Sequence, residues 1–176
     1  MPVVCFVGSS GVDKTTRIEN VVAEFKARGY HIAVIKHEPH KFNIDKKGKD
    51  SWRFSHAGAD IVTLSSKDRV YFIQHVVEEA SLEQIITIVE KQVDLVLVDG
   101  YKHSSLSMIE IVSSSVNSRI IHRPEDLLAI VSDHQIQIDI PQFSFKEVTS
   151  ITNFLIEQIA NGALNRRVSR MADDKK

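Results

Sequence analysis

The chain alternates between short apolar runs and segments whose apolar residues recur with a helical period. The apolar runs predict seven β-strands, the last of them weaker: Val3–Val7, His31–Ile35, Ile61–Leu64, Val70–Ile73, Leu95–Val98, Leu128–Val131 and Ser107–Val112. Several runs are continuously apolar, which is typical of strands buried on both faces in a sheet that helices cover.

Three segments carry apolar residues three and four positions apart, as on one face of a helix. Their stripes are Ile18, Val21, Val22 and Phe25; Leu82, Ile85, Ile86 and Val89; and Val148, Ile151, Leu155 and Ile159. A strand, a helix and a strand follow one another at the start, which indicates a right-handed βαβ unit. The pattern predicts an α/β domain with a mostly parallel sheet.

Local signals frame these helices. Ser81 with Gln84, and Ser144 with Glu147, have the spacing of a capping box. Gly29 follows the first stripe and Asn161-Gly162 follows the third, where helices commonly stop. We expect one domain over residues 1–162 and a disordered tail over residues 163–176.

A glycine-rich turn joins the first predicted strand to the first predicted helix. This is the context of a phosphate-binding loop, although an ordinary Gly-Ser turn is the alternative. Backbone N–H groups of such a loop point at phosphate oxygens, Lys14 reaches the β- and γ-phosphates, and the Thr15 hydroxyl binds Mg²⁺. The predicted nucleotide-binding residues here are Gly8, Ser9, Ser10, Gly11, Val12, Asp13, Lys14, Thr15 and Thr16.

One residue departs from the pattern G-x-x-x-x-G-K-[ST], because Asp13 stands where glycine is expected. A carboxylate there lies close to the phosphate charges, and like charges repel more strongly in a confined site than on an open surface. The side chain also occupies a backbone path that favours glycine. We expect weaker nucleotide binding than in an Asp13→Gly form.

Two further strands end in residues that suit the same site. Asp99 follows the apolar run Leu95–Val98 and resembles the acid of a Walker B element, which faces the Mg²⁺ shell. Lys36 and His37 end the second strand, and the carboxyl ends of parallel strands line the ligand crevice of an α/β sheet. We therefore expect Thr15 and Asp99 at the metal, and Lys36 and His37 near phosphate or a second substrate.

The segment His37–Ala59 is long, polar and charged, so we expect it to be functional or to contain further structure. His37 and His40 lie three residues apart near Asp45 and Asp50, which raises the possibility of a metal site. The absence of cysteine and of regular ligand spacing argues against that site, and a solvated loop is the plainer interpretation. The candidate substrate or partner residues are Lys36, His37, His40, Asp45, Lys49, Asp50 and Arg53.

Composition narrows the class of protein. The 176 residues include 22 Lys and Arg against 23 Asp and Glu, a net charge of −1 that argues against non-specific nucleic-acid binding. The single cysteine, Cys5, cannot form an internal disulfide, which indicates a reducing compartment such as the cytoplasm. No apolar run approaches the roughly 18 residues of a membrane-spanning helix.

The motifs together resemble the molybdopterin-guanine dinucleotide biosynthesis adapter protein (MobB) family, from about residue 2 to about residue 160. The pairing of Ile35-Lys36-His37 with Gly48-Lys49-Asp50-Ser51 is more specific than the phosphate loop itself. The other residues that carry the resemblance are Gly8, Lys14-Thr15-Thr16, Arg28-Gly29-Tyr30, His40, Asp45, Arg53, Ala57-Gly58-Ala59 and Leu97-Val98-Asp99-Gly100-Tyr101-Lys102.

The resemblance implies a cytoplasmic, homodimeric GTP-binding protein with a P-loop NTPase-like, three-layer fold and weak GTPase activity. Such proteins assist the guanylyltransferase that attaches GMP to molybdopterin, so Mg²⁺ with GTP, that enzyme and molybdopterin are the expected ligands and partners. Asp99 stands where the family usually has Glu, and the family's Arg after Ile109-Glu110-Ile111-Val112 is absent. Asp13 puts the GTPase activity in doubt.

The resemblance also bears on the end of Leu128–Val131, a strand that approaches the purine base in related nucleotide-binding folds. Asp133 could accept from guanine N1–H and N2–H₂, which adenine lacks, although a plain strand-end turn is the alternative. We favour dimerisation through the two strands Ile61–Leu64 and Val70–Ile73, which form a predicted hairpin that could instead extend the sheet.

Two other functions remain open on the sequence. A P-loop small-molecule kinase would use the charges of the inserted segment to orient an acceptor hydroxyl. A degenerate binding module would have lost hydrolysis through Asp13 and kept its protein contacts. Phosphate transfer to added metabolites distinguishes the first from a GTP-binding adapter, and absence of GTP turnover with retained partner binding identifies the second.

Overall fold

The computed structural model describes residues 1–38, 45–101, 106–116 and 118–164. These residues belong to two compact units: the described residues of 1–37 and 85–164 form the first, and those of 38–84 form the second. His40 and Lys102 lie outside the described residues, as does the predicted tail beyond Leu164. Leu164 itself is buried in the core, two residues past the boundary predicted for the domain.

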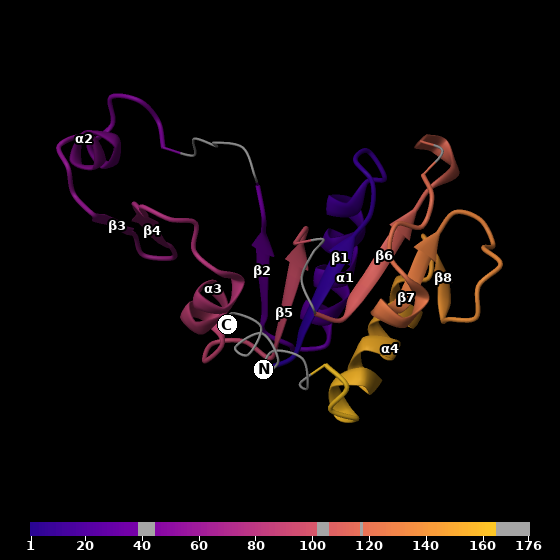
Figure 1. Ribbon diagram of the computed structural model, residues 1–176. Helices are drawn as coiled ribbons and strands as arrows, with labels where there is room; N and C mark the ends of the chain where they lie inside the picture. The colour runs from indigo at the N-terminus through magenta and orange to yellow at the C-terminus, as the bar shows by residue number, and fades with distance from the viewer. Residues whose placement is uncertain (39–44, 102–105, 117, 165–176) are drawn as a thin grey trace, which may run out of the picture. The chain divides into compact units, whose positions relative to one another are not determined.

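A six-stranded sheet forms the centre of the first unit (Figure 1). Its strands, in spatial order, are β2 (Ile32–Lys36), β5 (Leu95–Asp99), β1 (Val3–Val7), β6 (Met108–Val112), β7 (Leu127–Ser132) and β8 (Gln142–Ser144). Every neighbouring pair is parallel. This confirms the predicted α/β class and parallel sheet.

The helices α1 (Lys14–Ala27) and α4 (Val148–Ala160) pack against each other and share one core with the sheet. Phe25 of α1 and Leu155 of α4 are fully buried in this core, together with Val4, Phe6, Leu95, Leu97, Ile109 and Ile111 of the central strands. Cys5 and Val96 alternate with those strand residues and are also fully buried. Both faces of the central strands are therefore covered, as continuous apolar runs require.

The helix signals of the sequence are confirmed with one correction. At α3 (Leu82–Val89) the Ser81 N–H donates to Gln84 Oε1 at 2.8 Å and the Gln84 N–H to Ser81 Oγ at 3.2 Å, a complete capping box. The predicted box of Ser144 and Glu147 is wrong, because α4 begins only at Val148 and Glu147 occupies its N-cap. The Ser144 N–H donates to the Glu147 carboxylate at 2.6 Å, which lowers the pKa of Glu147.

Two regular elements were absent from the sequence prediction. Strand β8 is three residues long, too short for a hydrophobic pattern, and it pairs with β7 at the edge of the sheet. Helix α2 (Asp50–His56) lies in the inserted charged segment, where only one of its seven residues, Ser51, is buried. An exposed helix lacks the apolar stripe on which the prediction rests. Short 3₁₀ turns cover Ser114–Val116 and Pro124–Asp126.

The second unit contains α2 and an antiparallel hairpin of β3 (Ile61–Ser65) and β4 (Val70–Gln74). The hairpin confirms the predicted pair of strands. It forms a separate two-stranded sheet, so it does not extend the main sheet. Among the described residues of the chain, no helix combines the length and the apolar character needed to span a lipid bilayer.

Candidate nucleotide site

The loop between β1 and α1 has the tight backbone path of a phosphate cradle. Gly8 has φ 143°, and a Cβ atom on it would lie 2.5 Å from the backbone oxygen of Ile111 on the neighbouring strand β6. Gly11 also has a positive φ, 82°. Glycine at position 8 is therefore demanded by both conformation and space, which explains why the motif begins there.

Lys14 folds back over this loop. Its Nζ donates to the backbone oxygens of Gly8 at 3.2 Å and of Ser9 at 3.0 Å. The ammonium is thus held at the rim of the cradle formed by the loop and by the N-terminus of α1, which begins at Lys14 itself. Backbone N–H groups at a helix start, together with a fixed cation, provide the charge that a phosphate group needs.

Asp13 adopts the left-handed conformation, with φ 60° and ψ 42°. Aspartate tolerates this region better than most residues, so the loop keeps its path without glycine. The Thr16 hydroxyl donates to Asp13 Oδ1 at 2.5 Å, and Arg17 Nη2 lies 3.3 Å from Oδ2. Arg17 is itself held with its Cζ 4.2 Å from the centre of the Phe145 ring. These contacts offset part of the negative charge that Asp13 brings to the loop.

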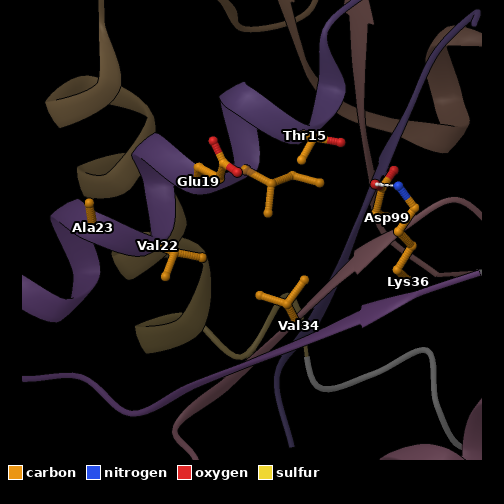
Figure 2. Close-up of a pocket in the computed structure, with 8 residues that line it drawn as sticks. Thr15, Glu19, Val22, Ala23, Val34, Lys36 and Asp99 are labelled. Atoms are coloured by element: carbon orange, nitrogen blue, oxygen red, sulfur yellow. Dashed lines mark ion pairs between the residues drawn. The ribbon is translucent and has the colours of Figure 1, made fainter. Parts of the chain in front are cut away.

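Thr15 and Asp99, the two residues that the sequence analysis assigns to Mg²⁺, line one cavity beside the loop (Figure 2). Asp99 ends β5 in register with Phe6 of β1, so the order of the strands brings it next to the loop. Its side chain is 9% exposed, and Lys36 Nζ lies 3.6 Å from its Oδ2. A largely buried carboxylate beside a threonine hydroxyl suits Mg²⁺, which binds few protein oxygens and completes its shell with phosphate and water.

The cavity has a volume of about 410 Å³ and runs between α1 and β2. Figure 2 shows Val22 and Ala23 of α1 and Val34 of β2 along its walls, with Lys36 and Asp99 paired at one end. Its body is apolar and its polar groups gather next to Thr15. Space for a ligand group therefore continues beside the predicted metal position.

The remaining insertion residues divide between the two units. In the first, the His37 N–H donates to the Asp99 backbone oxygen at 3.0 Å, and its ring centroid lies 4.5 Å from that of Tyr101. In the second, Asp45 accepts a hydrogen bond from Ser51 at 2.7 Å. Lys49 precedes α2, and Arg53 Nη1 lies 3.8 Å from Asp50 Oδ1.

The metal site considered around His37, His40, Asp45 and Asp50 has no support within the structure. Across residues 1–38, 45–101, 106–116 and 118–164, no three His, Cys, Asp or Glu side chains are grouped so that they could hold an ion. His40 falls outside these ranges.

Asp133 lies at the carboxyl end of β7, where its carboxylate is surrounded by donors. Its Oδ2 accepts from the Ser113 hydroxyl at 2.7 Å, its Oδ1 from the Ser114 N–H at 3.0 Å, and His134 Nδ1 lies 2.7 Å from Oδ1. The His134 imidazole, the Ser114 N–H and the Ser113 hydroxyl hold the pKa of Asp133 well below its usual range. The role of Asp133 as a guanine reader stays a prediction.

Glu110 is a further polar residue near the loop that the sequence did not assign to the site. It is fully buried on β6, in register with Val7 at the end of β1. Its oxygens accept hydrogen bonds from the backbone N–H groups of Ile121 at 2.8 Å and of His122 at 3.1 Å. The imidazole Nδ1 of His122 lies 3.1 Å from Glu110 Oε2. A lone acid inside the apolar run Ser107–Val112 was the available signal.

Known proteins resemble this chain over most of its length. A family model described as molybdopterin guanine dinucleotide synthesis protein B matches residues 3–133. The adapter protein of molybdopterin-guanine dinucleotide biosynthesis from Haemophilus influenzae is 30% identical, over 88% of this chain and 88% of its own. The protein of the same name from Escherichia coli is 29% identical, over 89% and 93%.

The likeness extends to three dimensions. A crystal structure of molybdopterin-guanine biosynthesis protein B superposes with a TM-score of 0.71 at 26% identity, covering 90% of this chain and 99% of that one. The P-loop geometry of β1, α1 and Asp99, the match to the family model and the shared fold agree with one another. The chain belongs to the MobB family, the molybdopterin guanine dinucleotide synthesis protein B family.

Proposed function

We propose that this protein is a cytoplasmic GTP-binding adapter in molybdopterin-guanine dinucleotide biosynthesis, working with the guanylyltransferase that attaches GMP to molybdopterin. Nucleotide binding is supported by the position of Lys14, whose ammonium donates to the Gly8 and Ser9 carbonyl oxygens. It is also supported by the cavity that Thr15 and Asp99 line together. The names of the Haemophilus influenzae and Escherichia coli relatives support the biosynthetic part.

In this proposal the loop and Lys14 hold the GTP phosphates, while Thr15 and Asp99 contact Mg²⁺ directly or through water. Mg²⁺ supplies charge neutralisation for the phosphates. Lys36 forms an ion pair with Asp99, so it lies where a phosphate or the second ligand would reach the metal. The apolar cavity beside it offers room for part of molybdopterin or of the partner enzyme.

A titration with GTP and with ATP, each with and without Mg²⁺, tests this proposal by calorimetry. We expect binding that depends on Mg²⁺ and favours GTP. Binding of neither nucleotide contradicts the proposal. Tight GTP binding without measurable turnover would identify the module that has lost hydrolysis, and it leaves the adapter role in place.

Asp13 is expected to weaken GTP binding through its charge rather than through its backbone. The left-handed conformation is already reached by Asp13 in the loop. Asp13→Asn keeps the size and the tolerance of positive φ but removes the charge, so we expect it to tighten GTP binding about fivefold, or about 1 kcal/mol. The gain should shrink as salt rises, because the carboxylate is half exposed.

Asp13→Gly is the matched comparison, since it also relieves the backbone. We expect it to gain no more than about twofold over Asp13→Asn, as measured in the same calorimetric titration. An improvement seen with glycine alone would show that the backbone, not the charge, limits binding. Equal affinities for all three forms would mean that Asp13 does not weaken binding at all.

The hairpin of β3 and β4 is the surface we propose for homodimerisation. Ile61, Val70 and Phe72 project from the same face, since their positions alternate with the buried Val62. Val70 is 68% exposed and Phe72 56% exposed. A two-stranded sheet is only marginally stable alone, and a second copy of this hairpin would cover the apolar face.

Phe72→Glu is expected to prevent this association. Light scattering after size-exclusion chromatography should give about twice 19.9 kDa for the unmodified protein and about 19.9 kDa for the variant. Lys67→Glu, in the turn between β3 and β4, is the control and should leave the mass unchanged. A mass of about 19.9 kDa for the unmodified protein, which is that of a monomer, contradicts the proposed interface.

A further inference from the structure

The loop that follows β6 approaches the loop between β1 and α1 at Gly11, on the side away from Asp99. In the sheet, β5 with Asp99 lies on one side of β1 and β6 on the other. A Cβ atom on Gly11 would lie 3.5 Å from Cγ1 of Val116, in the turn after β6. We define the β6–β7 connection as residues 113–116 and 118–126.

This geometry indicates which end of the proposed nucleotide lies on which side of β1. In the proposed complex the metal end of the phosphates lies at Thr15 and Asp99, which line one cavity, so the nucleoside extends toward the opposite side of β1. The β6–β7 connection lies on that side and approaches Gly11 through Val116, and it presents the exposed apolar side chains of Val116 and Ile121. Aliphatic side chains of this kind pack against the face of a ribose or a base.

Two carboxylates hold the connection at its ends. Near its start, Asp133 accepts from the Ser113 hydroxyl at 2.7 Å and from the Ser114 N–H at 3.0 Å. Near its end, Glu110 accepts from the N–H groups of Ile121 at 2.8 Å and of His122 at 3.1 Å. Between these anchors the Ser118 hydroxyl accepts from the Ser113 N–H at 2.7 Å, which closes the turn.

The burial of Glu110 makes this arrangement specific. A carboxylate with 0% exposure is costly unless donors surround it, and here two backbone N–H groups and His122 Nδ1 contact it. The same strand carries the Ile111 oxygen that Gly8 approaches. One strand thus fixes both the start of the phosphate loop and the end of the connection.

We propose that the β6–β7 connection is the wall of the nucleoside half of the site, and that Glu110 and Asp133 are positioning residues that hold it against the phosphate loop. This inference rests on the proposed GTP binding. It differs from direct recognition of guanine by Asp133, because the carboxylate acts through Ser113 and Ser114. Ligands with a nucleoside need the wall, whereas a bare polyphosphate needs only the loop and Lys14.

The test compares GTP with inorganic tripolyphosphate in calorimetric titrations of the 176-residue chain. Glu110→Gln replaces one acceptor oxygen by an amide nitrogen. Asp133→Asn makes the same replacement in the carboxylate that accepts hydrogen bonds from Ser113 and Ser114. We expect each to weaken GTP binding about tenfold and tripolyphosphate binding by less than about twofold. Asp139→Asn, an exposed acid in the connection between β7 and β8, should change neither.

Circular dichroism reports whether Glu110→Gln folds. If it does not, Asp133→Asn still tests the inference, because Asp133 is not buried in the core. Equal losses for GTP and tripolyphosphate, or no loss, would overturn the inference. Xanthosine triphosphate has a carbonyl oxygen where guanine has the 2-amino group, so a residue that reads guanine directly would favour it over GTP once Asp133 is replaced by Asn. Equal losses of affinity for GTP and xanthosine triphosphate in Asp133→Asn support the positioning role, whereas a gain of affinity for xanthosine triphosphate would overturn it.

The unmodified protein separates this inference from the proposed function. Binding of tripolyphosphate with no preference for GTP over it contradicts the nucleoside wall alone. Binding of neither ligand contradicts the proposed function, and the inference falls with it. A clear preference for GTP that disappears in Glu110→Gln and Asp133→Asn supports both.

Discussion

Lys14→Ala is expected to lower the affinity for Mg·GTP about a hundredfold, or about 2.7 kcal/mol. The Lys14 ammonium lies at the rim of the phosphate cradle, 3.2 Å and 3.0 Å from the Gly8 and Ser9 oxygens. Hydrogen bonds to charged groups contribute about 1.5–3 kcal/mol each. In the complex, phosphate oxygens would replace the two carbonyl oxygens as acceptors of the hydrogen bonds from the Lys14 ammonium. Calorimetric titration measures the loss.

Lys26→Ala is the matched control for Lys14→Ala. Lys26 lies in the last turn of the same helix α1 and donates to the Tyr30 backbone oxygen at 3.0 Å. Removing it changes the net charge by the same amount at the far end of the helix, so GTP affinity should stay within about twofold. Equal losses in the two variants would mean that total charge, not the cradle, governs binding.

Gly8→Ala is expected to lower the free energy of unfolding by about 3 kcal/mol. The new Cβ atom would lie 2.5 Å from the Ile111 backbone oxygen and 3.2 Å from Val12 Cγ2. Backbone of a central strand cannot move without disturbing its neighbours, and the φ of 143° adds conformational strain. For a chain of this size the melting temperature should fall by roughly 6–12 °C.

Gly29→Ala separates the steric clash of the new Cβ atom from the conformational strain of a positive φ. Gly29 also has a positive φ, 85°, but a Cβ atom there meets nothing within 4 Å. We expect a loss of about 1 kcal/mol, all of it conformational, as measured by urea unfolding followed by circular dichroism. Equal destabilisation at the two glycines would show that the approach of Gly8 to β6 costs nothing.

The loop between β1 and α1 was readable from the chain because it is local in sequence. Gly8 and Lys14 lie within one turn between a strand and a helix, and the order of residues there dictates the cradle. Asp99 was readable too, because an acid at the end of an apolar strand reaches the carboxyl edge of the sheet. In the structure it lies in register with Lys36 and Phe6.

Residues outside the apolar patterns were harder to predict. Helix α2 is mostly exposed and β8 is only three residues long, so neither produces a hydrophobic period. Glu110 interrupts an apolar strand, but nothing along the chain shows that its partners are the N–H groups of Ile121 and His122, eleven and twelve positions later. Asp133 was placed correctly at a strand end, while its bonds to Ser113 and Ser114 span about twenty positions.

The amino-acid sequence by itself therefore determined the α/β class, the glycine-rich loop with its aspartate at position 13, and the acid that ends β5. These features depend on neighbours along the chain and on the burial of apolar runs. Only the tertiary structure decided that β6 lies beside β1, so that Ile111 excludes any side chain at Gly8 and Glu110 fixes a loop next to Gly11. Strand order sets such contacts, and strand order depends on the packing of the whole sheet.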